Sequence, residues 1–259
     1  MTYEQQAKEL ESYIRPDAFP MAVRVLKPGE EPPAKARQPL RDLKVRISIC
    51  QAMGMARRYG WTIALGPEDQ SCPIAQVAVG FGPALPFYTE GNLACGMYAE
   101  TMEGGARAEA AIPKFKPGEA AWIVIGPLAK ATFNPDALIV YANSAQIMRL
   151  VAGAVYKKGG SLPAVAAPRA DCADLIVGTL RENTAQVILP CYGDRVFGLT
   201  QDHEMCFAMP YSQMDDLLKG LAGTEKGGVR YPIPANLRTE ADFPPKYKQL
   251  AEMWKTGKK

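Results

Sequence analysis

The sequence has a single histidine, no two cysteines at C-x-x-C spacing, and no apolar run long enough to cross a bilayer. One histidine gives little basis for a Ser-His-Asp triad or a histidine-rich metal site. The missing C-x-x-C pairs argue against a zinc ribbon, a ferredoxin-type cluster run and a thioredoxin motif. A transmembrane helix needs about 20 consecutive apolar residues, so we expect none. These absences favour a soluble protein whose chemistry cannot be identified from a short sequence motif.

Patterns for binding nucleotides or nucleic acids are missing as well. The glycine-rich stretches at 80–82 and 91–105 match neither G-x-G-x-x-G nor a P-loop. The net charge is only +3 over 259 residues, and the lysines and arginines are scattered. The pair Arg57-Arg58 is predicted to lie at a solvated helix end. Met1–Ile14 is charged and lacks the apolar core of a signal peptide. We therefore expect a cytoplasmic protein with no nucleic-acid or membrane partner.

What is present is an ordinary globular composition, with 47% hydrophobic and 22% charged residues. Hydrophobic periodicity predicts both helices and strands, so the expected class is α/β in the broad, mixed α+β sense, as one compact domain over residues 1–259. The strands predicted before residue 150 are Met21–Leu26, Trp61–Leu65, Ala120–Ile125 and Ala137–Ala142. The helices predicted are Tyr3–Tyr13, Leu43–Arg58, Ile74–Val79, Met97–Met102, Ala145–Tyr156, Ala173–Leu180, Gln213–Leu221 and Pro245–Lys255.

The stretch from Ile188 to Pro210 concentrates the residues that carry chemistry. Its apolar positions predict three short strands, around 187–189, 196–199 and 205–209, and Cys191 follows the first of them. A residue at the end of a strand is a common place for a binding group. The single histidine, His203, is predicted to lie in a solvated turn.

The six cysteines are dispersed, and a cytosolic protein of this size more often keeps them free or metal-bound than paired as disulfides. Cys72 and Cys172 are each placed at the start of a predicted helix, and Asp171 is a candidate cap for the second. Cys206 lies within a strand and is expected to be a small core residue. Cys95 has no assigned role.

The same order of predicted elements occurs twice: a strand, a helix, an extended piece and a helix that begins with cysteine. This order pairs Cys72 with Cys172 and Cys95 with Cys191. An internal duplication would explain this order. On that interpretation the chain divides into halves 19–118 and 119–222 with a C-terminal extension at 223–259, in which 227–245 is a proline-rich extended stretch.

From about residue 19 to residue 221 the chain resembles a bacterial and archaeal family, domain of unknown function 169. The residues that carry the resemblance are Cys50-Gln51, Gly60, Cys72, Gly80, Pro127-Leu128, Pro135-Asp136, Asn143, Gln146, Cys172, the run Pro190 to Arg195 (P-C-Y-G-D-R), Glu204-Met205 and Pro210. The family pattern has cysteines that match four of the six here, Cys50, Cys72, Cys172 and Cys191. The resemblance implies a thiol site and does not imply a particular reaction.

Four thiols from separate places match the ligand count of a [4Fe–4S] cluster and of a closed zinc site. We favour the cluster because structural zinc sites take their cysteines as close pairs in sequence. The leading hypothesis is a cytoplasmic iron–sulfur protein, held by Cys50, Cys72, Cys172 and Cys191, that serves electron transfer or a redox step on a small anionic ligand. The alternatives are a zinc-stabilised structural protein and a non-enzymatic module that binds a small ligand or tetrapyrrole.

Two further sets of residues belong to these hypotheses. Arg195, in a Gly-Asp-Arg turn, is the candidate for binding the anionic ligand, or else forms a salt bridge with Asp194 or Glu204 that fixes the turn. The tetrapyrrole alternative places its ligand in an apolar cleft under Phe81, Phe87, Tyr88 and Trp122. The expected partners are a small molecule or a redox protein, and homo-oligomerisation is left open.

Overall fold

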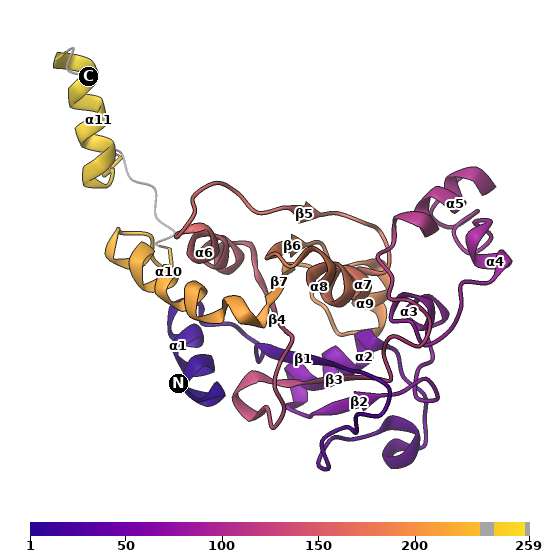
Figure 1. The fold of residues 1–259 in the computed structure, drawn as a ribbon. Helices are drawn as coiled ribbons and strands as arrows, with labels where there is room; N and C mark the ends of the chain where they lie inside the picture. The colour runs from indigo at the N-terminus through magenta and orange to yellow at the C-terminus, as the bar shows by residue number, and fades with distance from the viewer. Residues whose placement is uncertain (234–240, 257–259) are drawn as a thin grey trace.

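A seven-stranded sheet forms the centre of the molecule, shown in Figure 1 as a computed structural model that describes residues 1–233 and 241–256. The strand order is β2-β3-β1-β4-β7-β6-β5, and neighbouring strands are antiparallel except for β5 and β6. The strands are β1 (Met21–Leu26), β2 (Ile63–Leu65), β3 (Trp122–Pro127), β4 (Ala137–Asn143), β5 (Ala164–Val165), β6 (Gln186–Ile188) and β7 (Glu204–Pro210). The predicted mixed α+β class and single compact domain are confirmed.

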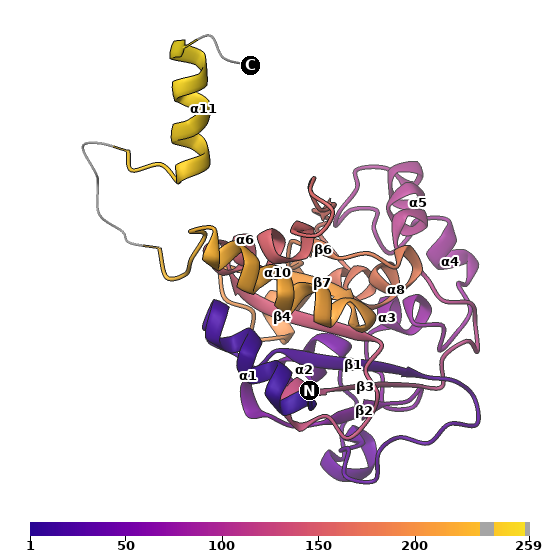
Figure 2. The ribbon, with the colours of Figure 1, turned by 60° about the vertical axis from the view of Figure 1, so that its left-hand side comes forward.

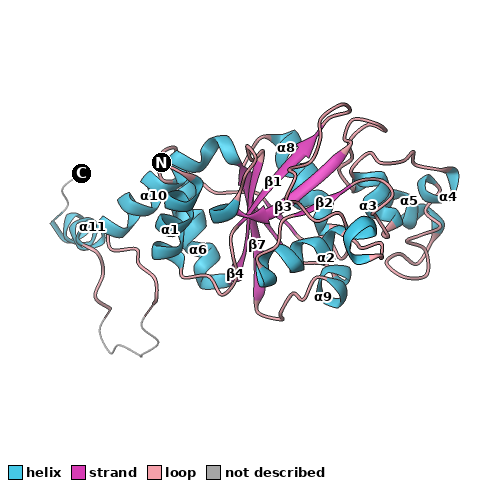
Figure 3. Ribbon diagram, turned by 90° about the horizontal axis from the view of Figure 1, so that it is seen from below, coloured by secondary structure: helices cyan, strands magenta, loops and turns pink. Residues whose placement is uncertain are grey.

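Helices cover both faces of the sheet, and Figure 3 shows the strands between the two layers. One layer is α1 (Tyr3–Ile14), α6 (Ser144–Val155) and α10 (Met214–Lys226). The other contains α2 (Ile49–Gly54), α3 (Pro73–Ala78), α7 (Asp171–Ala173), α8 (Thr179–Glu182) and α9 (Tyr192–Phe197), with π-helical turns η2 (Met55–Tyr59) after α2 and η4 (Asp174–Gly178) after α7. Alternation along β4 supplies both cores, since Leu138 and Val140 face the first layer while Ile139 and Tyr141 face the second.

The remaining elements are short or peripheral. Figure 2 shows α4 (Pro86–Thr89) and α5 (Met102–Ala111) at one end of the molecule, beyond α3. The others are η1 (Pro39–Leu43), η3 (Leu128–Lys130), η5 (Tyr211–Gln213) and α11 (Pro245–Thr256). The extended stretch predicted at 227–245 falls partly on 234–240, outside the described residues. Within the described ranges, no helix has the length and hydropathy needed to cross a membrane.

Three predicted elements differ from the structure, each because of a local backbone signal. The helix predicted from Leu43 starts at Ile49, because Ser48 caps it and forms a capping box with Gln51. The strand predicted at 196–199 is the end of helix α9. The helix predicted at 97–102 is a turn, and α5 begins where Thr101 accepts a hydrogen bond from the Gly104 N–H at 3.0 Å.

The topology contains the same unit twice. β1, α2, β2, α3 and β3 form the first unit, and β4, α7, β6, α9 and β7 form the second, with mirrored places in the strand order. Each third strand ends at a proline and is followed by a 3-10 turn whose first N–H donates to the residue just before the unit's first strand. These bonds run from Leu128 to Pro20 and from Tyr211 to Asp136, both at 2.8 Å.

This arrangement corrects the pairing of cysteines taken from the sequence. β3 lies between β1 and β2, so the first unit continues to residue 130 rather than stopping at 118. Cys50 in α2 corresponds to Cys172 in α7, because each precedes a π-helical turn and a short strand. Cys72 corresponds to Cys191, because each is the N-cap residue of the following helix. The long excursion through α4 and α5 obscures this order in the sequence.

The crossing of α6 and α10 gives a first testable result. A Cβ atom on Gly220 would lie 1.9 Å from the Gly153 carbonyl oxygen, so Gly220→Ala must push the two helices apart. We expect a loss of about 1–3 kcal/mol in the free energy of unfolding, measured by urea denaturation. Gly82→Ala is the control, because its Cβ would meet Gln76 at an ordinary 3.5 Å. Equal stability of the two variants would contradict the close packing.

Candidate metal and thiol site

The structure brings the four cysteines named by the sequence to one cavity of about 500 Å³ between the two units. Cys50, Cys172 and Cys191 are buried and Cys72 is half-buried. Cys50 and Cys172 project from the first turns of α2 and α7, while Cys72 and Cys191 stand at the starts of α3 and α9. Each unit therefore contributes one helix thiol and one N-cap thiol.

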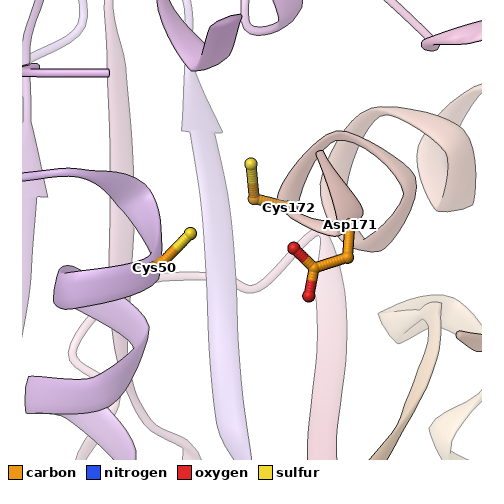
Figure 4. A group of neighbouring side chains, drawn as sticks. All are labelled: Cys50, Asp171 and Cys172. Atoms are coloured by element: carbon orange, nitrogen blue, oxygen red, sulfur yellow. The ribbon is translucent and has the colours of Figure 1, made fainter. Parts of the chain in front are cut away.

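Cys50, Cys172 and Asp171 form the tightest group at this site. One donor atom from each lies within 4.8 Å of the other two. Figure 4 shows the Cys50 sulfur and the Asp171 carboxylate pointing toward one another across the gap between α2 and α7. Two thiols and a carboxylate at this separation could hold a metal ion.

Asp171 is a site residue that the sequence reasoning misplaced. It was predicted to cap a helix, but the N-cap is Ala170, in a left-handed conformation, and Asp171 is the first helical residue. Its side chain is 1% exposed, and burial raises the pKa of its carboxyl, because hydrogen bonds from the Cys191 thiol and from the backbone N–H groups of Cys191 and Cys172 only partly offset the burial. Burial of a carboxylate is costly, so this environment favours a proton or a metal cation. The adjacency of Asp171 to Cys172 was the only sequence signal for this role.

Protons occupy the buried thiols when no metal is bound. The hydrogen bond to Cys50 and burial raise the pKa of Cys172 well above its ordinary value. The Cys172 hydrogen bond lowers the pKa of Cys50, but burial and the nearby Asp194 outweigh it, so the net pKa is raised. Burial and Asp171 raise the pKa of Cys191. A metal must displace these protons, so loading should improve as pH rises.

Asp194 is a second buried carboxyl close to Asp171. It is 1% exposed, and its Oδ2 accepts a hydrogen bond from the Thr200 hydroxyl at 2.6 Å. Burial, with repulsion from Asp171, raises the pKa of Asp194 to about 7. The sequence had suggested only an ion pair with Arg195 for this residue.

Beneath these carboxyls, Arg57 ties the two units together. Its guanidinium donates to Glu204 at 3.1 and 3.2 Å, to the Gly198 carbonyl at 2.8 Å and to the Thr200 hydroxyl at 2.7 Å. It also lies over the Tyr141 ring at 4.1 Å. Arg57 belongs to the first unit and its partners to the second, so these bonds join the two units close to Asp194, to which Thr200 is bonded. The sequence had treated Arg57 as part of a solvated helix end.

Arg195 lies outside the lining of the cavity. Its guanidinium donates to the Gln201 carbonyl at 2.8 Å, and the salt bridge suggested for it is replaced by this backbone contact. The arginine that does line the cavity is Arg169. His203 is exposed as predicted, and Cys206 is fully buried in β7.

The four aromatic residues predicted to cover a ligand are also absent from the cavity lining. Trp122 packs in a separate small core on β3, and Phe87 is exposed at α4. The apolar walls come instead from residues that the sequence had not singled out, namely Ile74, Leu93, Met97, Tyr98, Tyr192 and Phe197. Tyr192 and Phe197 come from α9, the helix mistaken in part for a strand.

Titration of Asp194 should be visible in the stability of the reduced, metal-free protein. Its folded pKa of about 7 lies above the value of about 3.9 in an unfolded chain, so the folded state binds more protons between these pH values. Ionisation of this carboxyl therefore lowers the free energy of unfolding as pH rises through this window, by at most about 1.4 kcal/mol per pH unit. We expect Asp194→Asn to gain stability relative to wild type from pH 5 to pH 8, measured by urea denaturation. Asp202→Asn, at an exposed position, serves as the control. A stability difference between Asp194→Asn and wild type that does not change with pH would contradict the raised pKa of Asp194.

Fold and site together define a two-unit α+β protein with a cysteine-lined cavity at the junction. The chain belongs to the family described as uncharacterised ArCR, domain of unknown function 169, whose model matches residues 9–220. It is similar to a protein of Methanocaldococcus jannaschii named uncharacterized protein MJ0308, with 25% identity over 222 residues, covering 84% of this chain and 92% of that protein. No solved structure matches the chain significantly.

Proposed function

We propose that the protein is a cytoplasmic iron–sulfur protein whose [4Fe–4S] cluster is held by Cys50, Cys72, Cys172 and Cys191. The observation that carries the proposal is that four thiols, two from each unit, line one cavity of about 500 Å³. Four cysteine ligands are what such a cluster requires, and the sulfur donors suit iron. The buried carboxyl of Asp171, within 4.8 Å of the Cys50 and Cys172 sulfurs, supports a cation at this place.

When bound, the cluster would supply one-electron transfer, either to a redox partner protein or in a step on a small anionic ligand. The protein's own residues set its surroundings. Arg57 and Glu204 join the two units near the buried carboxyls, and the apolar residues of α9 line one side of the cavity. Burial of a cluster and hydrogen bonds near its sulfurs tune its reduction potential.

A single metal ion is the second candidate, and one observation favours it. The donors of Cys50, Asp171 and Cys172 already lie within 4.8 Å of one another, which suits one ion more closely than a cluster. Zinc bound there would contribute folding free energy, so a chelator would lower the melting temperature.

Anaerobic expression and reconstitution with iron and sulfide separate the two. The cluster predicts broad absorbance near 400 nm, a colour lost on oxidation, and about four iron and four sulfide per chain, as the cluster composition requires. A colourless protein with one zinc per chain supports the single-ion site. A protein that retains neither metal after reconstitution contradicts both.

A further inference from the structure

Arg169 is a buried cation at the edge of the thiol cavity whose hydrogen-bonding capacity is only partly used. It is 5% exposed and lines the cavity, and its Nη2 donates to Glu109, itself 1% exposed. Within the described residues, its Nε and Nη1 groups have no acceptor. Buried N–H groups without an acceptor are rare and unfavourable, so these groups call for one.

The charges around Arg169 favour a ligand with a single negative charge. Lys114 is half-buried and donates to the backbone carbonyls of Glu109 and Ile112, both at 2.6 Å. Arg169 and Lys114 are balanced by Glu109 and by Asp174, which lines the adjoining cavity, when all four are ionised. A monoanion therefore adds one buried negative charge, whereas a dianion adds two, which is more strongly disfavoured.

Two cavities meet at Arg169 and Tyr98, and their chemistry differs. The second, of about 340 Å³, contains the carboxyl of Asp174, with no compensating cation besides Arg169 among the residues that line it. A negative ligand there would be repelled by Asp174. The thiol cavity is the larger of the two, at about 500 Å³, and no Asp or Glu side chain among the described residues lines it; Asp171 lies behind Cys50 and Cys172 and outside the lining. An anion therefore belongs on the thiol side.

The residues that line the thiol cavity indicate the chemistry of the rest of the ligand. Leu93, Met97 and Tyr98 line one part, and Tyr192 and Phe197 from α9 line another. The guanidinium of Arg169 also lies over the Tyr98 ring at 5.5 Å, which holds both side chains in place. A mostly apolar cavity with one well-placed polar group is typical of sites for small organic molecules.

We infer that the thiol cavity binds a small organic monocarboxylate, with its carboxylate on Arg169 and a flat apolar body between the α9 side chains and residues 93–98. A role for this molecule at the redox centre rests on the proposed function, whereas its binding to Arg169 does not. Arg169 takes the place that the sequence had given to Arg195.

Calorimetric titration of the reduced, metal-free, full-length protein tests the inference directly. The probes are benzoate, the neutral benzamide of the same shape, and the dianion phenyl phosphate. Benzoate should bind at least about tenfold more tightly than either, the size expected from one charge-assisted hydrogen-bonded contact. Failure of benzoate to bind, or equal binding of benzamide, overturns the inference.

Three variants locate the contact. Arg169→Gln alone would strand the buried Glu109, so the informative change is the pair Arg169→Gln with Glu109→Gln, which removes both charges. This pair should weaken benzoate about tenfold or more and leave benzamide unchanged. Glu109→Gln alone leaves Arg169 unopposed and should tighten benzoate. Arg195→Gln is the matched control, and a loss of benzoate binding in it, or none in the double variant, overturns the assignment.

Because these titrations use protein without metal, they stand apart from the proposed cluster. Benzoate binding with no iron uptake would refute the cluster and keep the ligand site. Iron uptake with no selective benzoate binding would refute the ligand site and keep the cluster. Circular dichroism of each variant confirms that it is folded before its affinity is compared.

Discussion

Cys172→Ser is expected to abolish stable incorporation of iron on anaerobic reconstitution, measured as iron and sulfide per folded chain and as cluster absorbance. Cys172 lies at the centre of the site, hydrogen-bonded to Cys50 and adjacent to Asp171. Serine replaces the soft sulfur donor by a hard, weakly acidic hydroxyl, which iron in a cluster accepts poorly. The loss should exceed the 10–100-fold that changes in outer-shell partners of a metal site typically cause.

The two-unit arrangement extends this prediction to a second cysteine. Cys50 occupies in the first unit the position that Cys172 occupies in the second, so Cys50→Ser should cause a comparable loss. Cys95→Ser is the control, because Cys95 is half-buried in the turn before α5, where its thiol contacts the Glu100 carbonyl at 3.9 Å, and lies outside the cavity lining. Iron uptake by Cys172→Ser equal to that of Cys95→Ser would refute the proposed ligand set.

Cys206→Ser separates loss of ligand from loss of stability. Cys206 is fully buried within β7 and is one of the core residues on the face of the sheet that carries the thiols. Serine there places a hydroxyl in an apolar environment and should lower the melting temperature without changing the iron content of the folded fraction. A metal-binding role for Cys206 would show instead as loss of iron at unchanged stability.

Local signals marked three of the four thiols, and the family resemblance added Cys50. Pro73 after Cys72 and the strand before Cys191 mark element ends, and residues at element ends can converge from distant parts of a chain. Hydrophobic periodicity likewise predicted β4 and α6 nearly residue for residue. What converges on the cavity could not be predicted in the same way, because it depends on the order of strands in the sheet.

The errors have physical causes at particular residues. Val196 and Phe197 were assigned to a strand because exposed apolar residues in a helix of six residues give no helical period. Asp171 and Asp194 looked like a helix cap and a surface ion pair, since aspartate is common in both roles and burial cannot be inferred from its neighbours. Arg57 and Glu204 are 147 residues apart, and nothing local indicates that they meet.

That buried pair should produce the largest change in stability of any single substitution proposed for this protein. Arg57 is fully buried and makes two bonds to Glu204, which is 3% exposed, and Arg58 adds a third bond to the same carboxylate at 2.7 Å. Removal of one partner of a buried ion pair costs about 3–5 kcal/mol when the other charge is left unpaired. We expect the lower part of this range, because Arg58 and the Gln201 N–H still bond to Glu204. Arg57→Met keeps the volume and removes the charge, so Glu204, Thr200 and the Gly198 carbonyl all lose a donor. For a chain of this length we expect the melting temperature to fall on the order of 10 °C.

The exposed pair of Arg46 and Glu68, at 3.4 Å, is the matched control, because Arg46→Met removes a similar side chain from solvent at a cost of about 0–1 kcal/mol. Arg58→Met should fall between the two, since Arg58 is partly exposed and Glu204 keeps its bonds to Arg57. The same substitutions also test the site, because Arg57 donates a hydrogen bond to the Thr200 hydroxyl, which in turn donates to Asp194. Arg57→Met should therefore disturb metal loading as well as stability, whereas Arg46→Met should change neither. If Arg57→Met were as stable as Arg46→Met, the contact between the two units would not depend on this arginine.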